Sequence, residues 1–435
     1  MTTTAAIEAN RLPAHLALGA IRRGELSSVD LVETCLARIA ERERAVGAWC
    51  HLDREAAIRQ ARAADERQRS GAQLGPLHGL PIGIKDVFDT ADMPSEYGSP
   101  SLSGRRPQHD ADAVARLRAT GAVIMGKTVT SEFGMYAATS CRNPHDSERS
   151  AGVSSAGSAA AVADFMVPLA LGTQHTASTL LPASFCGAFG FKPSFGFTSM
   201  RGSNILVPRL ANVGFLARSV ADLALFASAF SAELDISAPH APRRLGLVRG
   251  PAWPQVTGDA AAALEALCRR LPIAVEEIVL PAEFDAAERT TLGLLAAHMA
   301  YRFGRTSAET IRGYNAALGD LIAVGHEMDA AKYIAFDSAA DELAAAADGL
   351  FAHADALITL SALGEAPPAS QPGSGALCMP WSLAGLPAMS LPLSRGARGL
   401  PIGIQLIGRR GDDAKLLSVA AWITDAAIAK APEPI

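Results

Sequence analysis

Helical and strand patterns alternate along the chain, which predicts an α/β fold: a single large domain with a central mixed β-sheet covered by helices on both faces. Three observations carry this prediction. Short apolar runs alternate with amphipathic stretches. Hydrophobic residues make up 49% and charged residues 19% of the chain, enough to build a core. No internal repeat or low-complexity linker divides the 435 residues. We therefore expect one domain, 1–435, with residues 1–70 forming a helical segment packed on it.

The elements are predicted in order from periodicity and capping residues. Apolar side chains at helical spacing predict a helix over 29–44, and Ser27 with Asp30 offers a capping start. A second helix is expected over 54–68, and residues 79–88, GLPIGIKDVF, indicate a buried strand that leads into a loop. Further helices are expected at 110–119, 218–230, 258–270, 283–300, 306–350 and 412–427, and further strands at 122–125, 245–248, 273–280, 356–360, 388–393 and 402–407.

Charge and composition exclude several classes of function. The formal net charge is -5, and the 39 Lys and Arg residues form no dense cluster, so we expect no nucleic-acid partner. No uncharged apolar run is long enough to span a membrane, and the N-terminus lacks the pattern of a signal peptide. The six cysteines are dispersed, which favours reduced thiols. We expect a soluble cytoplasmic protein.

One short motif is a decoy. Residues 121–128, GAVIMGKT, fit the pattern of a phosphate-binding loop. The interior of the motif is bulky and apolar and reads as a strand, with no room to wrap a phosphate. We interpret it as a strand that ends in a Gly-Lys turn.

The informative segment is 150–193, SAGVSSAGSAAAVADFMVPLALGTQHTASTLLPASFCGAFGFKP. Ser154 and Ser155 precede an alanine-rich helix, whose N-terminal N–H groups favour developing negative charge. An apolar strand and a small-residue loop that ends in Ser178 follow. Taken alone, each serine is more often a cap or turn residue than a nucleophile.

The whole pattern, however, resembles the amidase-signature family. The likeness covers the serine-rich segment and the upstream G-x-x-x-x-K-D stretch at 79–86. It continues through CRNPHD at 141–146, VGFLARSVAD at 213–222, GLPAMSLPL at 385–393 and GLPIGIQLIG at 399–408, in the family's order. Ser178 follows Ser154 by 24 residues, the separation that the family keeps.

The resemblance implies a cofactor-independent amidohydrolase that acts on a small linear amide through an acyl-enzyme. Ser178 matches the family's nucleophile, Ser154 the proton-relaying serine that follows a cis peptide bond, and Lys85 the general base. The backbone N–H groups of His175, Thr176, Ala177 and Ser178 match the oxyanion hole. Family analogy also offers Met135, Tyr136, Ser155 and Trp381 as pocket residues, although core packing explains such residue types equally well. No metal-ligand cluster is expected, and the side chain of His175 is not expected to act in catalysis.

Several positions depart from the family pattern. Val153, Ala156 and the run His175-Thr176-Ala177 replace small or glycine residues, which predicts either backbone strain or a shifted loop. Leu180 replaces the signature arginine, so we expect an uncharged, rather apolar substrate. Two alternatives stay open: a subunit of an amidotransferase-type complex, and a degenerate homologue that serves as a binding protein. The partners compatible with the sequence are a small amide substrate and a second copy of the chain, bound as a homodimer through the N-terminal helices.

Overall fold

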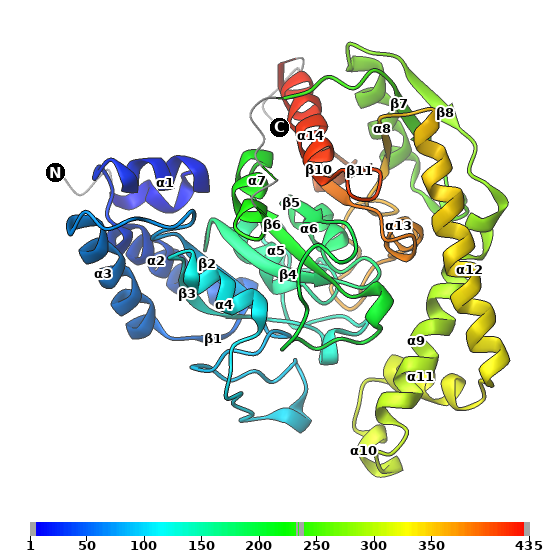
Figure 1. Cartoon of the computed structure of the whole chain (residues 1–435), viewed down its shortest axis with the longest axis horizontal. Helices are drawn as coiled ribbons and strands as arrows, with labels where there is room; N and C mark the ends of the chain where they lie inside the picture. Colours follow the sequence, from blue (N-terminus) through cyan, green and yellow to red (C-terminus); the bar gives the residue numbers. More distant parts are fainter. Residues whose placement is uncertain (1–5, 232–233, 235–238, 430–435) are drawn as a thin grey trace.

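The computed structural model of the chain describes residues 6–231, 234 and 239–429. Eleven strands pair into one mixed sheet in the order β1-β3-β2-β4-β6-β5-β10-β11-β9-β7-β8 (Figure 1). The strands are β1 Trp49–Leu52, β2 Pro81–Lys85, β3 Val123–Thr128, β4 Leu169–Gln174, β5 Phe189–Lys192, β6 Asn212–Ala217, β7 Leu245–Val248, β8 Val275–Ile278, β9 Ala356–Leu360, β10 Ala388–Arg395 and β11 Pro401–Ile407.

Parallel and antiparallel pairs divide this sheet into regions. β2 lies parallel to both β3 and β4, and β7 lies parallel to both β8 and β9. The strands between these two groups pair antiparallel. This arrangement is the mixed sheet that the sequence predicts, and it places the end of β2 in the interior of the molecule.

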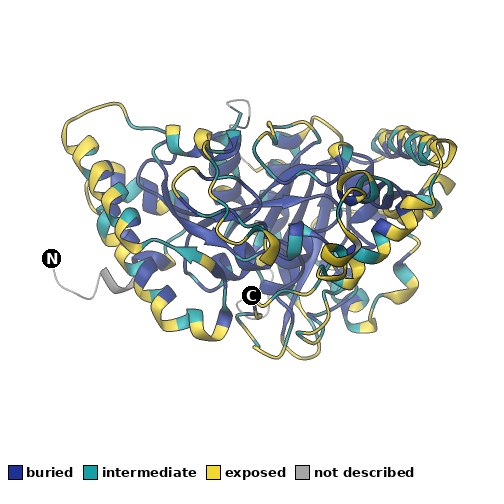
Figure 2. Ribbon diagram, turned by 90° about the horizontal axis from the view of Figure 1, so that it is seen from below, coloured by how far each residue is buried: buried dark blue, intermediate teal, exposed yellow. Residues whose placement is uncertain are grey.

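Helices surround the sheet. Figure 2 shows the buried strands in the middle and the exposed outer sides of the helices around them. α5 packs on β2, β3, β4 and β6, whereas α14 packs on β10 and β11. The helices are α1 Ala14–Arg22, α2 Ser28–Val46, α3 Arg54–Arg69, α4 Asp112–Ala119, α5 Ala156–Ala163, α6 Leu180–Cys186, α7 Val220–Ser228, α8 Gly258–Arg270, α9 Ala287–Phe303, α10 Ala308–Arg312, α11 Ala316–His326, α12 Ala330–Gly349, α13 Met379–Leu383 and α14 Asp413–Ala429.

Two expectations for the secondary structure are wrong. The stretch 306–350 is not one helix but three, because α10 ends against Gly313 and the side chains of Asn315 and Asp329 cap the starts of α11 and α12. The Gly-Lys turn expected after residue 125 is strand: β3 continues through Lys127. Gly126 permits this, because a Cβ there would lie 2.3 Å from the carbonyl oxygen of His51 on β1.

Lys127 shows why GAVIMGKT binds no phosphate. Its side chain is fully buried, and its Nζ lies 3.0 Å from Asp86 Oδ1 and donates to Ser95 Oγ and to the carbonyl of Phe88 at 2.7 Å each. The lysine is thus committed to the loop after β2.

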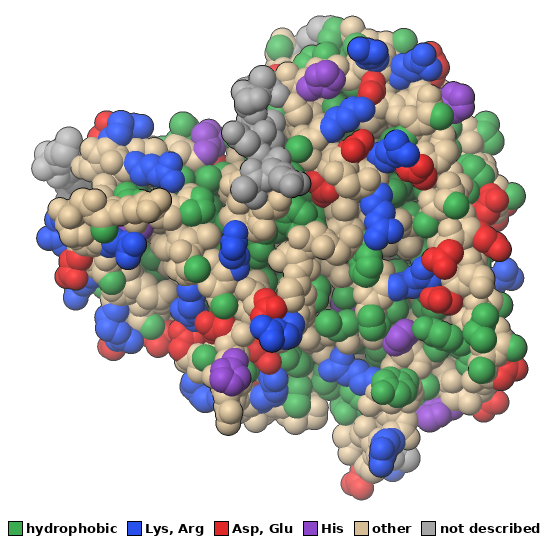
Figure 3. Space-filling view, in the orientation of Figure 1, with side chains coloured by type: hydrophobic (Ala, Val, Ile, Leu, Met, Phe, Trp, Pro, Cys, Tyr) green, Lys and Arg blue, Asp and Glu red, His purple; other side chains and the backbone are tan. Residues whose placement is uncertain are grey.

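The face of the molecule drawn in Figure 3 carries cations and anions interspersed, with no dense basic area. No helix in the described ranges is long and apolar enough to cross a membrane.

Candidate functional site

Lys85 is the last residue of β2, and its side chain is completely buried. Its Nζ lies 2.7 Å from Ser154 Oγ, 3.0 Å from Ser155 Oγ and 2.7 Å from Thr173 Oγ1. No carboxylate forms an ion pair with Lys85 among the described residues. Burial therefore dominates, and it holds the pKa of Lys85 well below the ordinary value of a lysine. The favoured form is a neutral amine, which can accept a proton.

The hydrogens around this amine have a restricted arrangement. A neutral amine has two N–H donors and one lone pair, so one of its three hydroxyl neighbours must donate to it. Ser155 Oγ already donates to the carbonyl of Thr173 at 3.1 Å. The donor to Lys85 is therefore Ser154 or Thr173. If it is Ser154, that hydroxyl is ready to pass its proton to the lysine.

Ser154 and Ser155 lie immediately before α5, with Ser155 in the N-cap position. The turn before them needs Gly152, whose φ is +109° and whose missing Cβ would lie 2.7 Å from Cα of Pro182. The cis peptide bond expected before Ser154 is not found. No peptide bond in the described ranges is cis, so Ser154 follows a trans bond, the lower-energy form for a non-proline residue. Val153 also avoids the left-handed region, so its β-branch adds no strain of that kind.

Ser155, offered by family analogy as a pocket residue, lies beside Lys85. The residue is fully buried, and its hydroxyl is used by Lys85 and by both backbone groups of Thr173. Its position at the N-cap turns the side chain toward β4. Ser155 therefore belongs to the hydroxyl cluster that surrounds Lys85.

Ser178 lies on the loop between β4 and α6 and is 8% exposed, compared with 1% for Ser154. Its hydroxyl makes no hydrogen bond within the described part of the chain. The backbone N–H groups of residues 175–178 likewise have no hydrogen-bond acceptor there. None of these residues takes a positive φ, so the replacement of glycines does not force the loop into the left-handed region. The loop thus offers the hydroxyls of Ser178 and Thr176, which are 8% and 7% exposed, and a run of N–H donors without an acceptor in the described residues.

Gln174, at the end of β4, braces this loop. Its Oε1 accepts from the N–H of Thr179 at 2.9 Å and from that of Leu180 at 3.0 Å. Its Nε2 donates to Ser382 Oγ at 3.0 Å, and Ser382 Oγ donates to the carbonyl of Thr176 at 2.6 Å. A single buried amide therefore ties together the strand end, the middle of the loop and the start of α6.

The side chain of His175 turns away from the chemistry. Its Nε2 accepts from the N–H of Leu206 at 3.2 Å. Burial, with smaller contributions from Lys85 and Arg302, lowers the pKa of His175 to about 3. The ring is therefore neutral, and its Nε2 is already occupied by the N–H of Leu206.

The remaining pocket candidates lie in one apolar cluster or at its edge. Met135 and Trp381 are buried in the cluster that also contains Ala177 and Leu180. Tyr136 packs at the edge of this cluster; its hydroxyl donates to the carbonyl of Gly373 and accepts from the N–H of Gly375, and burial raises its pKa to about 12. The loop that contains Gly373 therefore borders this region. Leu180 and Leu181 are fully buried, so the start of α6 offers apolar surface where the family pattern has an arginine.

Sequence reasoning missed Thr173 and Ser382 and assigned no role to Gln174. Thr173 stands in an apolar strand, and only the pairing of that strand shows that its hydroxyl reaches Lys85. Ser382 lies 208 residues from Gln174 and gives no local signal.

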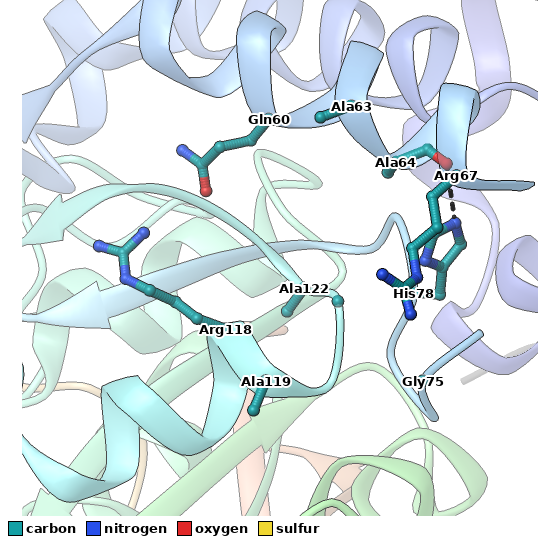
Figure 4. Close-up of a pocket in the computed structure, with 10 residues that line it drawn as sticks. Gln60, Ala63, Ala64, Arg67, Gly75, His78, Arg118, Ala119 and Ala122 are labelled. Carbon is teal, nitrogen blue, oxygen red and sulfur yellow. Dashed lines mark hydrogen bonds between the residues drawn. The ribbon is translucent and has the colours of Figure 1, made fainter. Parts of the chain in front are cut away.

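A separate cavity between α3 and α4 does not belong to this site (Figure 4). Its volume is about 470 Å³, and Arg67 and Arg118 project from its two sides. Lys85, Ser154 and Ser178 do not line it. His78 faces it from the edge, with Nε2 3.0 Å from the carbonyl of Ala64.

Comparison with known proteins agrees with this geometry. The family model for amidases matches residues 30–417. A glutamyl-tRNA(Gln) amidotransferase subunit from Chloroflexus aggregans is 36% identical over 93% of this chain and 94% of its own length. Among solved structures, the peptide amidase of Stenotrophomonas maltophilia superposes with a TM-score of 0.80, at 29% identity over 96% of this chain and 97% of that one.

Another solved structure comes from a vestigial protein complex that bears on the origins of an s-triazine catabolic enzyme. It superposes with a TM-score of 0.88, at 28% identity over 95% of this chain and 98% of that one. Two findings lead to one conclusion. The family model matches most of the chain, and the relative from Chloroflexus aggregans is similar over nearly its full length. The chain belongs to the amidase-signature family, whose enzymes are carbon–nitrogen hydrolases.

Proposed function

We propose that this protein hydrolyses the C–N bond of an amide, with Ser178 as nucleophile, Ser154 as proton relay and Lys85 as general base. The observation that carries the proposal is the buried Lys85 amine, which has hydroxyl groups but no carboxylate around it. A serine hydroxyl needs a base to become nucleophilic, and a lysine is a base only when burial keeps it neutral.

The proposed reaction has two halves. Ser178 Oγ attacks the amide carbon, and its proton passes through Ser154 to Lys85. The C–N bond then breaks as the nitrogen takes a proton from Ser154, which Lys85 replaces, and the amine or ammonia leaves. In the second half, water attacks the ester carbon and its proton passes through Ser154 to Lys85; the ester C–O bond then breaks as the same groups return that proton to Ser178 Oγ, and the carboxylic acid is released. The free N–H groups of His175, Thr176, Ala177 and Ser178 would stabilise the negative oxygen in both halves.

The substrate we propose is small and uncharged near the cleaved bond. Leu180 and Leu181 are apolar and buried, and Met135 and Trp381 belong to the same cluster as Leu180. Such a surface favours an apolar acyl group over a carboxylate. A panel of neutral amides and of anionic monoamides of similar size tests this. Faster turnover of the anionic members would reject the proposed specificity.

A second candidate is a subunit of an amidotransferase-type complex. The relative from Chloroflexus aggregans, which is similar over nearly its full length, carries the name of such a subunit, and one of the similar solved structures comes from a protein complex. The relatives support this role more strongly than that of a free-standing enzyme, whereas the apolar start of α6 favours neutral amides over glutamine. Purification of the chain from its native source, followed by a glutamine hydrolysis assay, separates the two. A partner that copurifies and is needed for activity on glutamine supports the subunit role.

A fluorophosphonate probe tests the chemistry without knowledge of the substrate. We expect one covalent label, located on Ser178 by mass spectrometry, and its loss in both Ser178→Ala and Lys85→Ala. Labelling that persists in Ser178→Ala would remove Ser178 from its role. A correctly folded chain that is never labelled and turns over no amide would instead support the degenerate binding protein.

A further inference from the structure

We propose that a cavity at the C-terminal end of α6 binds a small carboxylate attached to an apolar body. The cavity has a volume of about 480 Å³ and is lined by Cys186, the last residue of α6, and by the following Gly187. Neither Lys85, Ser154 nor Ser178 lines it. It is therefore distinct from the site proposed for amide hydrolysis, which lies at the other end of the same helix.

Positive charge concentrates on the lining of this cavity. Arg11, Arg218, Arg395 and His145 all contribute to it, and no aspartate or glutamate does among the described residues. Within the described ranges, none of the three arginines forms an ion pair. Several guanidinium groups without an ion pair around one cavity favour an anionic ligand, and the planar guanidinium group pairs well with a carboxylate.

Two carboxylates bear on the charge of this lining. Asp164 precedes Phe165 and forms ion pairs with Arg38 at 2.7 Å and Arg42 at 3.0 Å. Asp222, on α7, lies 2.7 Å from His15 and also attracts the charge of Arg218, so Arg218 is neutralised in part, whereas Arg11 and Arg395 form no ion pair in the described ranges.

Arg218 itself meets only neutral acceptors in its hydrogen bonds. It donates to the carbonyls of Val167, Asn10 and Leu12 at 2.7 to 2.9 Å. These contacts fix the position of the guanidinium group but do not cancel its charge. The folded chain thus holds a fixed cation at the wall of the cavity.

Phe165 supports two of the cavity's cations. Its φ is +58°, because it ends α5 in the left-handed conformation, with the N–H of Met166 bonded to the carbonyl of Ala161. Its ring lies under the guanidinium carbons of Arg11 and Arg218, which are 4.9 and 5.1 Å from its centroid. The end of the helix thus fixes the ring on which both arginines rest.

The rest of the lining determines the class of the ligand. Phe189, Pro392, Leu393 and Pro401 contribute apolar surface opposite the charged groups. A bare inorganic anion would leave this surface unused, whereas an aryl or alkyl carboxylate covers it and pairs with the arginines. We therefore assign the cavity to a monocarboxylate with an apolar body, such as a substituted benzoate.

Calorimetric titration of the full chain with benzoate, benzamide and inorganic phosphate tests this assignment. We expect benzoate to bind at least about tenfold more tightly than benzamide, which has the same body without the charge, and more tightly than phosphate. The double variant R11Q/R395Q changes two exposed side chains and should weaken benzoate binding by about tenfold or more, in line with the loss of charge-assisted hydrogen bonds. The matched control R54Q/R62Q also removes two charges, from the exposed surface of α3, and should leave binding unchanged.

A Phe165→Gly variant gives a second measurement. Glycine adopts a positive φ freely, so this chain is expected to fold, while the loss of the ring should weaken benzoate binding. Benzoate affinity unchanged in both R11Q/R395Q and Phe165→Gly overturns the proposal, as does equal binding of benzamide. Phosphate that binds more tightly than benzoate rejects the apolar part of the assignment. The readout is binding and not turnover, so failure of the proposed hydrolysis would not affect it.

Discussion

The Nζ of Lys85 and the Oγ1 of Thr173 lie 2.7 Å apart, although the two residues belong to adjacent parallel strands and are 88 positions apart in the chain. This contact supplies a hydroxyl partner to a lysine that forms no ion pair with any carboxylate in the described part of the chain. Together with the contact to Ser154, it sets the direction in which the amine points. Thr173 therefore positions the proposed base without touching a substrate.

Replacement of Thr173 by valine should slow the acylation of Ser178 while leaving the fold intact. Valine keeps the shape of the side chain and removes one hydrogen bond to Lys85. The lost hydrogen bond should raise the activation free energy of acylation by about 1–2 kcal/mol, which corresponds to a decrease of roughly tenfold in rate. The measurement is the rate of fluorophosphonate labelling at several pH values.

Thr359 offers a matched control for this variant. It is a buried threonine of β9 in the same sheet, and its hydroxyl has no hydrogen-bond partner. Thr359→Val should leave the labelling rate unchanged. If Thr173→Val labels at the native rate across the pH range, Thr173 does not position Lys85.

Lys85→Met should abolish labelling of Ser178 and change how stability depends on pH. Burial lowers the pKa of Lys85 in the folded chain, so between that pKa and about 10.4 the unfolded chain binds more protons at this residue. The stability contributed by this residue therefore rises with pH by about 1.4 kcal/mol per unit and is lost as the pH falls. The variant lacks this dependence, so its stability relative to the native chain should decrease as the pH rises.

Urea unfolding of both chains between pH 7 and pH 9 measures this difference. The exposed Lys332 provides the control, because Lys332→Met should run parallel to the native chain at every pH. Parallel curves for Lys85→Met and the native chain would show that Lys85 is charged when folded. That result would remove the basis for its role as a general base.

Gln174 should affect acylation more than stability. Its amide holds the N–H groups of Thr179 and Leu180 on one side and the hydroxyl of Ser382 on the other. Gln174→Ala should reduce the labelling rate by about tenfold to a hundredfold, because three buried hydrogen bonds that shape the loop are lost. Gln174→Glu keeps the acceptor for the two N–H groups and should recover part of the rate.

Gln405 is the comparison for a purely structural effect. It is buried in β11 and donates to the carbonyls of Leu360 and Leu377, away from the loop. Gln405→Ala should lower the melting temperature about as much as Gln174→Ala does, and it should leave the labelling rate of the folded fraction unchanged. Equal rate losses in Gln174→Ala and Gln405→Ala would mean that Gln174 acts through stability alone.

The sequence predicts more of the fold than of the residues that support Lys85 and the loop that contains Ser178. Strands at 245–248 and 356–360 coincide with β7 and β9, because short apolar runs between turn residues identify strands well. The breaks within 306–350 had a local signal in Gly313, Asn315 and Asp329, which cap the helices. Strands β5 and β6 were not predicted; each is short and has a glycine within it, Gly190 and Gly214.

Site residues divide in the same way. Lys85, Ser154 and Ser178 stand in motifs of contiguous residues, so the resemblance to the family is enough to single them out. The hydroxyl of Thr173 reaches Lys85 only through the register in which β2 pairs with β4, and Ser382 reaches Gln174 only through the packing of α13. Local pattern carries no information about such contacts between distant segments. Burial of Ser155 likewise follows from how α5 meets β4 and not from its place beside Ser154.

His15 should make the attachment of α1 depend on pH. Its Nδ1 lies 2.7 Å from Oδ1 of the buried Asp222 on α7, and this hydrogen bond raises the pKa of His15 in the folded chain. A raised pKa gives stability that is fully present below the unfolded value of about 6.5 and is lost as the pH rises through the folded pKa. Because the side chain of His15 is 38% exposed, solvent screening limits the effect to about 1 kcal/mol or less.

His15→Gln should therefore remove a decrease in the free energy of unfolding that the native chain shows between pH 5.5 and pH 8.5. The other charged group near Asp222 is Arg218, which stays protonated over this range and so adds no pH dependence of its own. His109 is exposed and gives the control, because His109→Gln should keep the native slope. If the native chain and His15→Gln lose stability in parallel over this range, the pair with Asp222 does not couple α1 to pH. Limited proteolysis near residues 22–27 adds a local readout, since cleavage there should increase with pH only in chains that keep His15.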